Sequence, residues 1–299
     1  MKNKLFLFIL PLLLAGGWLP AQTKVSAVKV GSHIDINIGS LFFTSYIFSP
    51  DQKYPFFYPV NGPSGASVTS MRNGTYPHHS SLFFGCDMVN GGNYWQEGLE
   101  RGRIVSLRED ILENDGPRVV LENECIWSRP GAASPIRDLR RITVSAPSRD
   151  LFQIDFEVTM EMLLDVTIRK TNHSLFSGRI DPALAVVNGG TMINAEGVRG
   201  EKETFGKPSA WMDCSGKRGE VIEGIAILQH PSNRWYPSPW FTRDYGFFSP
   251  TPMYWPADEK AGTVMKKGET VLLKYRVLVH SGSHEAARIA EEFRKYSTP

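Results

Sequence analysis

Histidine, arginine and aspartate are the residue types in this sequence whose placement could support proton-transfer chemistry. Four of the seven histidines lie in segments that read as loops and that also contain Arg, Asp or Trp. His78 and His79 are adjacent, and His173 ends the tripeptide Thr-Asn-His. An imidazole changes its charge near neutral pH, and a loop carboxylate such as Asp244 can act as its partner. We therefore predict His79, His173 and Asp244 as acid/base residues.

Aromatic and polar side chains accompany these histidines. The face of a Trp or Tyr ring fits the apolar face of a sugar, and Asn, Asp, Arg and His form hydrogen bonds with hydroxyl groups. This combination favours a small sugar or an oligosaccharide over a lipid as the ligand. The residues predicted to contact it are His78, Asn90, Trp95, Arg179, Asp181, His230, Trp240 and Arg243. The alternative is that the aromatic loops only pack beneath the sheet edges and that Arg243 only forms an ion pair.

The spacing of metal-binding residue types favours a site without a metal or another cofactor. Adjacent residues of an extended segment point to opposite faces, so we expect one of His78 and His79 to face the site and the other to support it. A metal held by histidines of distant loops is the alternative. No zinc motif joins the three widely spaced cysteines, which we expect to be buried thiols, with one disulfide as the alternative: Cys86, Cys125 and Cys214.

Residues 1–21 have the three parts of a secretory signal peptide. Lys2 and Lys4 precede an apolar run, and small residues then lead to Ala21. The run is about half as long as the roughly 20 residues that a membrane-spanning helix needs. We therefore expect cleavage after Ala21, a periplasmic or secreted protein, and no membrane contact after cleavage.

The remaining chain, 22–299, is expected to form a single domain, because it contains no repeat, no low-complexity tract and no long linker. Its 33 basic and 31 acidic residues are interleaved and give a net charge of +2. A nucleic-acid partner is therefore not expected, since such proteins carry a basic stripe.

Strand patterns dominate this domain. Residues 151–160 show this pattern, with Phe152, Ile154, Phe156 and Val158 on one face. The same reasoning predicts strands at 34–38, 41–48, 104–111, 119–127, 141–145, 163–170, 221–228 and 271–279, with a hairpin turn at 113–117. Only 284–296 reads as a helix, with Ser283 as its N-cap. We predict a mainly β fold, a large antiparallel β-sandwich with a C-terminal helix.

The motifs of a known family extend over most of the mature chain. They are Gly62-Pro63-Ser64-Gly65, Pro77-His78-His79, Val89-Asn90-Gly91 to Trp95, Lys170 to Phe176, Trp211 to Gly216, and His230 to Gly246. Together they resemble a bacterial family of unknown function, DUF6807, whose members are often labelled "methane oxygenase PmoA". The resemblance implies a bacterial protein involved in the breakdown of glycans or sugars. It does not support the label, because a membrane-bound oxygenase subunit needs several spanning helices.

Two departures from this family concern the predicted ligand. Tyr58-Pro59 stands where the family commonly has His-Pro, and Ser80-Ser81 follows the two histidines where the family has Arg-Gly. The resemblance therefore implies a ligand that differs from that of other members, or weaker binding.

Thr171-Asn172-His173, with Phe176, is also similar to a motif of galactose mutarotase-like proteins. That weaker resemblance implies a large antiparallel β supersandwich. In those proteins a histidine gives a proton to the sugar ring oxygen, and a late carboxylate takes one from the anomeric hydroxyl. His173 would be the acid, and Asp244 is the nearest substitute for the base by position.

Two classes of function fit these observations, and a metal-dependent enzyme is a third possibility. One is a sugar-active enzyme of mutarotase, epimerase, lyase or hydrolase type, in which two groups exchange protons with the substrate. The other is a glycan-binding protein that uses the same residues without turnover.

Overall fold

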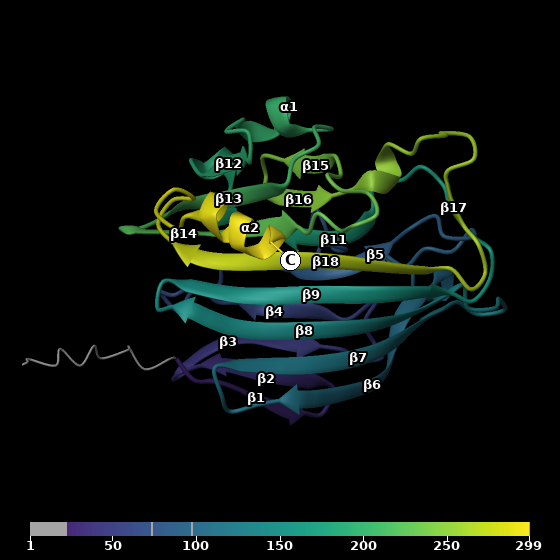
Figure 1. Ribbon diagram of the computed structural model, residues 1–299, viewed down its shortest axis with the longest axis horizontal. Helices are drawn as coiled ribbons and strands as arrows, with labels where there is room; N and C mark the ends of the chain where they lie inside the picture. Colours follow the sequence, from purple (N-terminus) through teal and green to yellow (C-terminus); the bar gives the residue numbers. More distant parts are fainter. Residues whose placement is uncertain (1–22, 73, 97, 299) are drawn as a thin grey trace, which may run out of the picture.

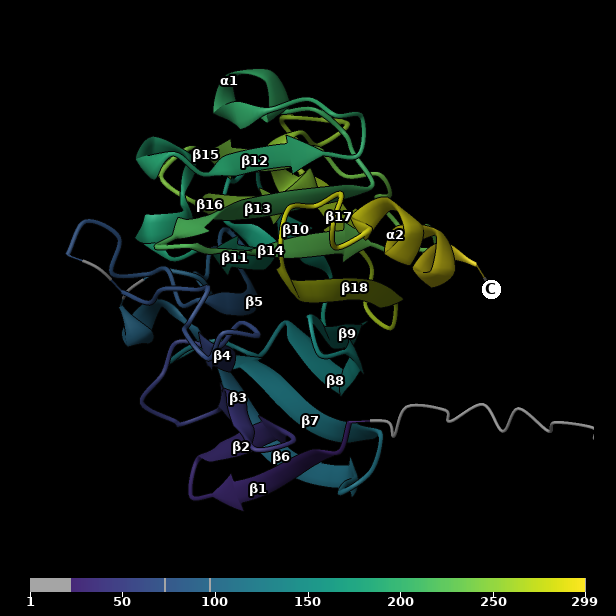
Figure 2. The same cartoon turned by 90° about the vertical axis from the view of Figure 1, so that its left-hand side faces the viewer.

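The computed structural model describes residues 23–72, 74–96 and 98–298, so the predicted signal peptide lies outside the described residues. Two eight-stranded antiparallel sheets, here named the first and the second sheet, are stacked on each other (Figures 1 and 2). The strand order is β1-β2-β3-β4-β5-β11-β16-β15 in the first sheet and β12-β13-β14-β18-β9-β8-β7-β6 in the second. The predicted antiparallel β architecture is confirmed.

The strands of the two large sheets differ in length. The first sheet contains β1 (Val25–Val30), β2 (His33–Ile38), β3 (Leu41–Ile47), β4 (Phe56–Val60), β5 (Leu82–Cys86), β11 (Ser174–Arg179), β16 (Phe247–Pro250) and β15 (Trp240–Arg243). The second sheet contains β12 (Thr191–Asn194), β13 (Trp211–Arg218), β14 (Val221–Gln229), β18 (Thr270–Ser281), β9 (Leu151–Met162), β8 (Ile136–Ser148), β7 (Arg118–Ser128) and β6 (Arg103–Glu113). A short pair, β10 (Val166–Ile168) and β17 (Thr263–Met265), lies apart from both.

Alternating side chains of the two facing sheets form the core. Phe84 of β5 and Phe176 of β11 pack on Phe156 of β9, with ring centroids 5.9 and 5.0 Å away. Ile154 and Val158 share the buried face of β9 with Phe156, as the alternation predicts. Burying a side chain of this size contributes about 1.5–3 kcal/mol.

Arg140 and Asp138, both on β8, form an ion pair inside this core. The Nε atom of Arg140 donates to Oδ1 of Asp138 at 2.8 Å, and neither side chain is exposed. Trp127 donates its Nε1–H to Oδ2 of the same carboxylate at 2.7 Å. The charge of this buried arginine is therefore compensated within the protein.

The three cysteines, at positions 86, 125 and 214, are buried and free, in agreement with the first of the two expected states. Burial raises the pKa of each thiol well above its ordinary value. These groups therefore behave as apolar core atoms and not as nucleophiles.

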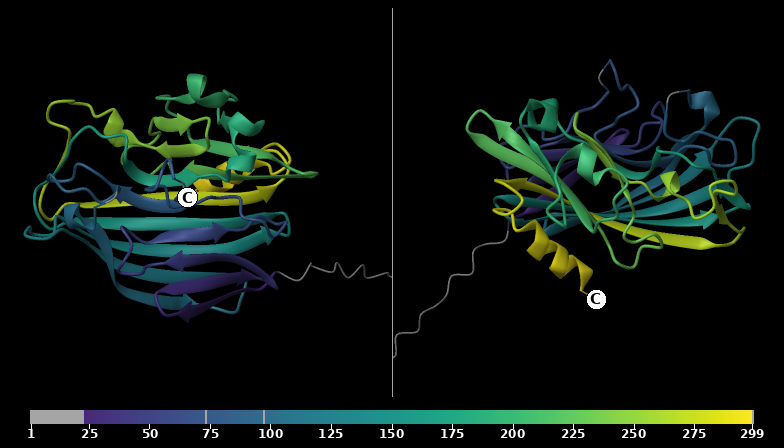
Figure 3. Two further views of the ribbon diagram at one scale, coloured as in Figure 1. Left: turned by 180° about the vertical axis from the view of Figure 1, so that it is seen from behind. Right: turned by 90° about the horizontal axis from the view of Figure 1, so that it is seen from above.

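The C-terminal helix α2 (Ile289–Ser297) lies on the outside of the second sheet (Figure 3, right-hand view). The predicted helix begins later than expected because Arg288 has a left-handed backbone, with φ of 56°. Ser283 still caps a turn, since its Oγ accepts a hydrogen bond from the N–H of Ala286. Ile289 and Phe293 attach the helix to Leu278 and its neighbours. No helix in the described part of the chain is long and apolar enough to cross a membrane.

Candidate functional site

The centre of the candidate site is the outer face of the first sheet at β5, β11 and β16. Phe83 of β5 pairs with Ser177 of β11, and Arg179 of β11 pairs with Phe247 of β16. Phe176 and Phe84, at the alternate positions, point into the core. Because successive side chains of a strand point to opposite faces, the side chains of Phe83, Arg179 and Phe247 project outward.

His173, directly before β11, is held by three neighbours on this face. Its Nδ1 atom lies 3.3 Å from Oδ2 of Asp87 and 2.5 Å from Nε2 of Gln96. Its ring stacks on Trp95 with a centroid distance of 5.7 Å. The backbone fixes the pair as well, because Asp87 N–H donates to the carbonyl oxygen of His173 at 3.0 Å. The orientation of the His173 ring is therefore fixed by its contacts at Nδ1 and by its stacking on Trp95.

The Asp87 contact determines how His173 can handle a proton. An ionised carboxylate only accepts hydrogen bonds, so its contact with Nδ1 is favourable when Nδ1 carries the proton. Gln96 then presents its amide oxygen to the same N–H, since the two amide orientations are interchangeable in shape. In this tautomer Nε2 of His173 is the nitrogen that can accept a proton from a ligand.

His79 differs from His173 in its environment. It is only 4% exposed and is stacked between Tyr76 and Phe247, with centroid distances of 5.0 and 4.4 Å. Burial, followed by the charges of His78 and Arg179, lowers the pKa of His79 to about 2. The imidazole of His79 is therefore neutral at physiological pH and can donate one hydrogen bond and accept another.

His78 links these two histidines. Its ring lies edge-to-face on His79 at 4.5 Å and on His173 at 5.6 Å, measured between centroids. His78 is partly exposed, whereas His79 is buried. Because His78 lies in a turn, the two rings contact each other and do not point to opposite faces as they would in an extended segment. The three imidazoles form a row.

Arg179 extends the row at the end marked by His79. Its guanidinium lies over the rings of Tyr76 and Tyr245, at 5.3 and 4.6 Å from their centroids. The two tyrosine rings stack on each other at 4.4 Å. Burial lowers the pKa of Arg179, and no carboxylate of the described residues forms an ion pair with it.

Unpaired buried polar atoms concentrate in this region. Among the described residues, eight buried side-chain nitrogen or oxygen atoms have no hydrogen-bond partner in the protein. Five of them belong to the site: Nδ1 of His79, Oδ1 of Asp87, Nε1 of Trp95, and Nε and Nη1 of Arg179. Buried polar groups in proteins are normally paired, so a concentration of exceptions is typical of a place where a polar ligand binds.

The structure thus brings together five of the predicted residues: His78, His79, Trp95, His173 and Arg179. Trp95 is fully buried, with Phe83 against its ring at 4.7 Å. Its ring packs against His173, and because Trp95 is fully buried, it offers no ring face to a sugar.

Four other predicted residues have local structural roles. Asp181 caps the short 3-10 helix Pro182–Leu184 and lies 3.1 Å from Arg218. Trp240 is fully buried and donates its Nε1–H to the carbonyl oxygen of Ser209 at 2.9 Å, so it belongs to the core.

Asn90 and His230 lie outside the row of histidines, according to the contacts of the described residues. The side chain of Asn90 accepts a hydrogen bond from the N–H of Thr167. The ring of His230 packs on Tyr296 of α2.

Arg243 and Asp244 are engaged with the helix α1 (Gly200–Thr204). Arg243 donates to Oε1 of Glu201 at 3.0 Å, so the ion-pair alternative describes it. Oδ1 of Asp244 accepts the N–H of Glu201 at 2.8 Å, and Asp244 N–H donates to Oε2 of Glu201 at 3.0 Å. Asp244 is thereby placed as a support of α1 and not as the direct partner of His173.

Sequence reasoning missed four residues that shape the site: Asp87, Gln96, Tyr76 and Tyr245. Asp87 follows directly on the buried strand β5, a position that could have indicated it. The pairing of Tyr76 with Tyr245 arises only when the loop before β5 meets the turn before β16, and no spacing in the sequence indicates that contact.

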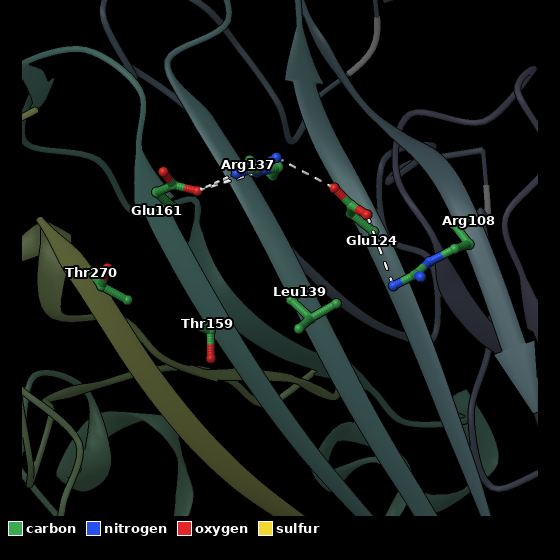
Figure 4. A pocket seen from close by; sticks show the side chains of 7 residues that line it. All are labelled: Arg108, Glu124, Arg137, Leu139, Thr159, Glu161 and Thr270. Atoms are coloured by element: carbon green, nitrogen blue, oxygen red, sulfur yellow. Dashed lines mark hydrogen bonds and ion pairs between the residues drawn. The ribbon is translucent and has the colours of Figure 1, made fainter. Parts of the chain in front are cut away.

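A hollow on the opposite side of the molecule contains none of these residues. It lies on the outer face of the second sheet, where Arg137 forms ion pairs with Glu161 at 2.7 Å and Glu124 at 3.7 Å (Figure 4). Arg108 lies 4.0 Å from Glu124 and extends this series of ion pairs across the sheet. The charges of this face pair with one another, as is usual on a solvated sheet.

Among the described residues, no group of three or more His, Cys, Asp or Glu side chains is arranged to hold a metal ion.

The family model of DUF6807, described as a family of unknown function, matches residues 33–294. The chain belongs to the DUF6807 family. Two of the motifs by which its sequence resembles DUF6807 supply the three imidazoles of the row. They are Pro77-His78-His79 and the segment Lys170 to Phe176, which contains His173.

A third DUF6807 motif, Gly62-Pro63-Ser64-Gly65, joins the two sheets. Ser64 donates both its backbone N–H and its hydroxyl to the carboxylate of Glu223 on β14, each at 2.7 Å. A Cβ atom on Gly62 would lie 2.5 Å from Oε1 of Glu223, so the close approach requires glycine. This anchor holds the start of the loop 61–81, which carries Tyr76 and the two histidines.

Two solved structures are also similar to this DUF6807 chain. One, from Escherichia coli K12, carries a provisional assignment as an aldose 1-epimerase; it is 11% identical, with a TM-score of 0.35 over 86% of this chain and 98% of that one. The other is a galactose mutarotase related enzyme from Lactobacillus acidophilus; it is 10% identical, with a TM-score of 0.34 over 87% of this chain and 97% of that one. No curated protein matches the sequence.

Proposed function

We propose that this protein binds a small sugar or glycan fragment on the outer face of the first sheet and exchanges a proton with it through His173. The contact between His173 and Asp87 carries this proposal. A carboxylate behind an imidazole fixes its tautomer and stabilises the imidazolium that forms when the other nitrogen takes a proton. His173 is partly exposed, whereas Asp87 is buried behind it.

The reaction class is acid/base catalysis of mutarotase, epimerase, lyase or hydrolase type. Each of these reactions needs one group that takes a proton and another that gives one. His173 is the first of these groups, and His78, whose ring faces it at 5.6 Å, is the second. The neutral His79 supplies hydrogen bonds to the sugar or to His78, because its lowered pKa prevents it from holding a second proton near neutral pH.

Asp244, the carboxylate predicted as the base, takes a different place in this proposal. Its Oδ1 atom accepts the N–H of Glu201, which ties the carboxylate to α1. Asp87 replaces it as the carboxylate of the site, as a positioning residue that acts through His173.

Residues 1–21 are proposed to direct this protein out of the cytoplasm, into the periplasm or the medium. Sequencing the N-terminus of the protein recovered from cells tests this part. A start at residue 22, within one or two residues, is expected, and an uncleaved N-terminus in every fraction would contradict it.

A thermal-shift screen with mono- and oligosaccharides, followed by turnover assays on every sugar that stabilises the protein, tests the proposed site. A ligand that binds only the folded state raises the melting temperature. His173→Ala should abolish both the shift and the turnover. His230→Ala is the matched control, because His230 packs on α2 at the second sheet. Equal loss in both variants, or no loss in either, would remove the site from consideration.

A glycan-binding protein without turnover is the second candidate function. It is favoured by the stacking of the buried His79 on Tyr76 and of Tyr76 on Tyr245, which suits a rigid binding surface. A sugar-induced thermal shift that His173→Ala weakens, together with no product formed at any pH, would establish binding alone.

A further inference from the structure

Two arginines are buried among the residues that the structure describes, and they differ in their partners. Arg140 is held by the carboxylate of Asp138 within the core. Arg179 is 4% exposed and forms no ion pair with any described carboxylate. Two of its three guanidinium nitrogens, Nε and Nη1, are buried without an acceptor. A buried cation without a carboxylate is costly, so arrangements of this kind are unusual in a purely structural role.

The tyrosine rings beside Arg179 compensate only part of this cost. Tyr76 and Tyr245 present their faces to the guanidinium at 5.3 and 4.6 Å. Such cation–π contacts contribute attraction to the ring faces but leave N–H groups in the guanidinium plane available for an acceptor. The stacking also holds the guanidinium in one orientation.

Arg179 is close to the proposed sugar site. The guanidinium of Arg179 packs on Tyr76, and Tyr76 stacks on His79. The charge of Arg179 also contributes to the low pKa of His79. His78 is the next ring along the row. His173 follows His78. A ligand that touches His173 at one end of this row therefore has Arg179 near its other end.

We propose that Arg179 binds an anionic substituent of the ligand, so that the natural ligand is an acidic sugar carrying a carboxylate, sulfate or phosphate group. This proposal rests on the proposed function and specifies its substrate class. The planar guanidinium matches the geometry of such oxyanions, and an anion supplies the acceptor and the countercharge that the protein does not.

Calorimetric titration of the wild-type protein with matched sugar pairs tests the proposal directly. The pairs are galactose with galacturonate, glucose with glucuronate, and galactose with its 6-sulfate and 6-phosphate. We expect at least one charged member to bind roughly 10-fold to 100-fold more tightly than its neutral partner, the range that a charge-assisted hydrogen bond supplies. The member that binds most tightly identifies the oxyanion.

Arg179→Gln should remove this preference, so that the neutral and the charged sugar of a pair bind the variant with affinities that differ by less than about 3-fold. Arg179→Lys keeps the charge but loses the planar fork, so it should retain part of the preference. Arg243→Gln is the matched control, since Arg243 is also packed on aromatic rings but is paired with Glu201. The melting temperature of each variant shows whether it is folded.

The outcomes separate this proposal from the proposed function. Equal binding of neutral and charged sugars by the wild type, with loss of both in His173→Ala, would overturn the role of Arg179 and leave the sugar site intact. An unchanged preference in folded Arg179→Gln would also overturn it. If Arg179→Gln does not fold, the comparison of neutral and charged sugars on the wild-type protein still tests the role of Arg179, because that comparison needs no variant. Absence of binding by every sugar, neutral or charged, would overturn both proposals.

Discussion

The Oδ2 atom of Asp87 lies 3.3 Å from Nδ1 of His173, where the end of β5 meets the start of β11. Since Ser174 pairs with Cys86 in the ladder, Asp87 and His173 are neighbours through the backbone of the sheet and not only through their side chains. An imidazole and its carboxylate are more accurately placed on strand ends than on free loops.

Replacing Asp87 with asparagine should impair turnover more than binding. The amide cannot stabilise the imidazolium of His173, so we expect kcat to fall roughly 10²-fold to 10⁴-fold, the usual contribution of acid/base catalysis. The measurement is the initial rate across the pH range, with sugar affinity determined in parallel. Asp150→Asn, in an exposed turn, is the control. An unchanged pH–rate profile in Asp87→Asn would show that Asp87 does not act through His173.

The low pKa of His79 predicts how stability depends on pH. In the unfolded chain a histidine has a pKa near 6.5, whereas burial lowers that of His79 to about 2. The unfolded state therefore binds more protons below pH 6.5, and the contribution of His79 is complete above that pH and is lost as the pH falls. The free energy of unfolding should decrease by up to about 1.4 kcal/mol per pH unit from this group.

Urea unfolding of the wild type and of His79→Phe between pH 7 and pH 4 checks this slope. Phenylalanine keeps the stacking on Tyr76 and Phe247 but cannot take up a proton. The variant should lose stability more slowly on acidification. Parallel curves for the two proteins would contradict the assignment of a neutral, desolvated His79.

Alanine at Gly62 should destabilise the protein by about 1–3 kcal/mol, the usual cost of overpacking. The added methyl group would lie 2.5 Å from Oε1 of Glu223 and 3.0 Å from Val68. Moving Glu223 away would break its two hydrogen bonds with Ser64. Gly74→Ala, with no atom within 4 Å of the new methyl group, is the control. Equal melting temperatures for the two variants would contradict the tight contact.

Removing one partner of the buried Asp138–Arg140 ion pair should lower the free energy of unfolding more than replacing both partners with apolar residues. Asp138→Asn leaves Arg140 charged and unpaired in the core, and we expect a loss of about 3–5 kcal/mol. Replacing both residues with apolar side chains of similar size should cost less than the sum of the single changes. Chemical unfolding of the two single variants and the double variant gives the coupling energy. Additive losses would mean that the two side chains do not stabilise each other.

Residues of regular strands could be predicted from the sequence, because their pattern is local. Phe156 and Ile154 are buried where the alternation of 151–160 places them. The C-terminal helix was predicted for the same reason, but its first residue was not, since the left-handed conformation of Arg288 has no signature in an Arg side chain.

The candidate site could be predicted only in part. His173, His79 and Arg179 were found by residue type, whereas Asp87 and Tyr245 reach them through strand pairing and loop contacts between distant segments. Trp240 was misplaced for the converse reason: a tryptophan beside polar loop residues has the composition of a binding surface, yet its strand turns it into the core. Contacts of this kind depend on tertiary packing.

The anchor between Ser64 and Glu223 has a consequence for protein engineering. The loop that carries Tyr76, His78 and His79 belongs to one sheet, but the carboxylate that secures its first turn belongs to the other. If residues 61–81 were grafted onto another scaffold, the first turn of the loop would lose the two hydrogen bonds that hold it, unless the opposite sheet supplied a carboxylate. The structural unit that would have to be transferred is discontinuous: one loop together with one residue of a strand distant in the sequence.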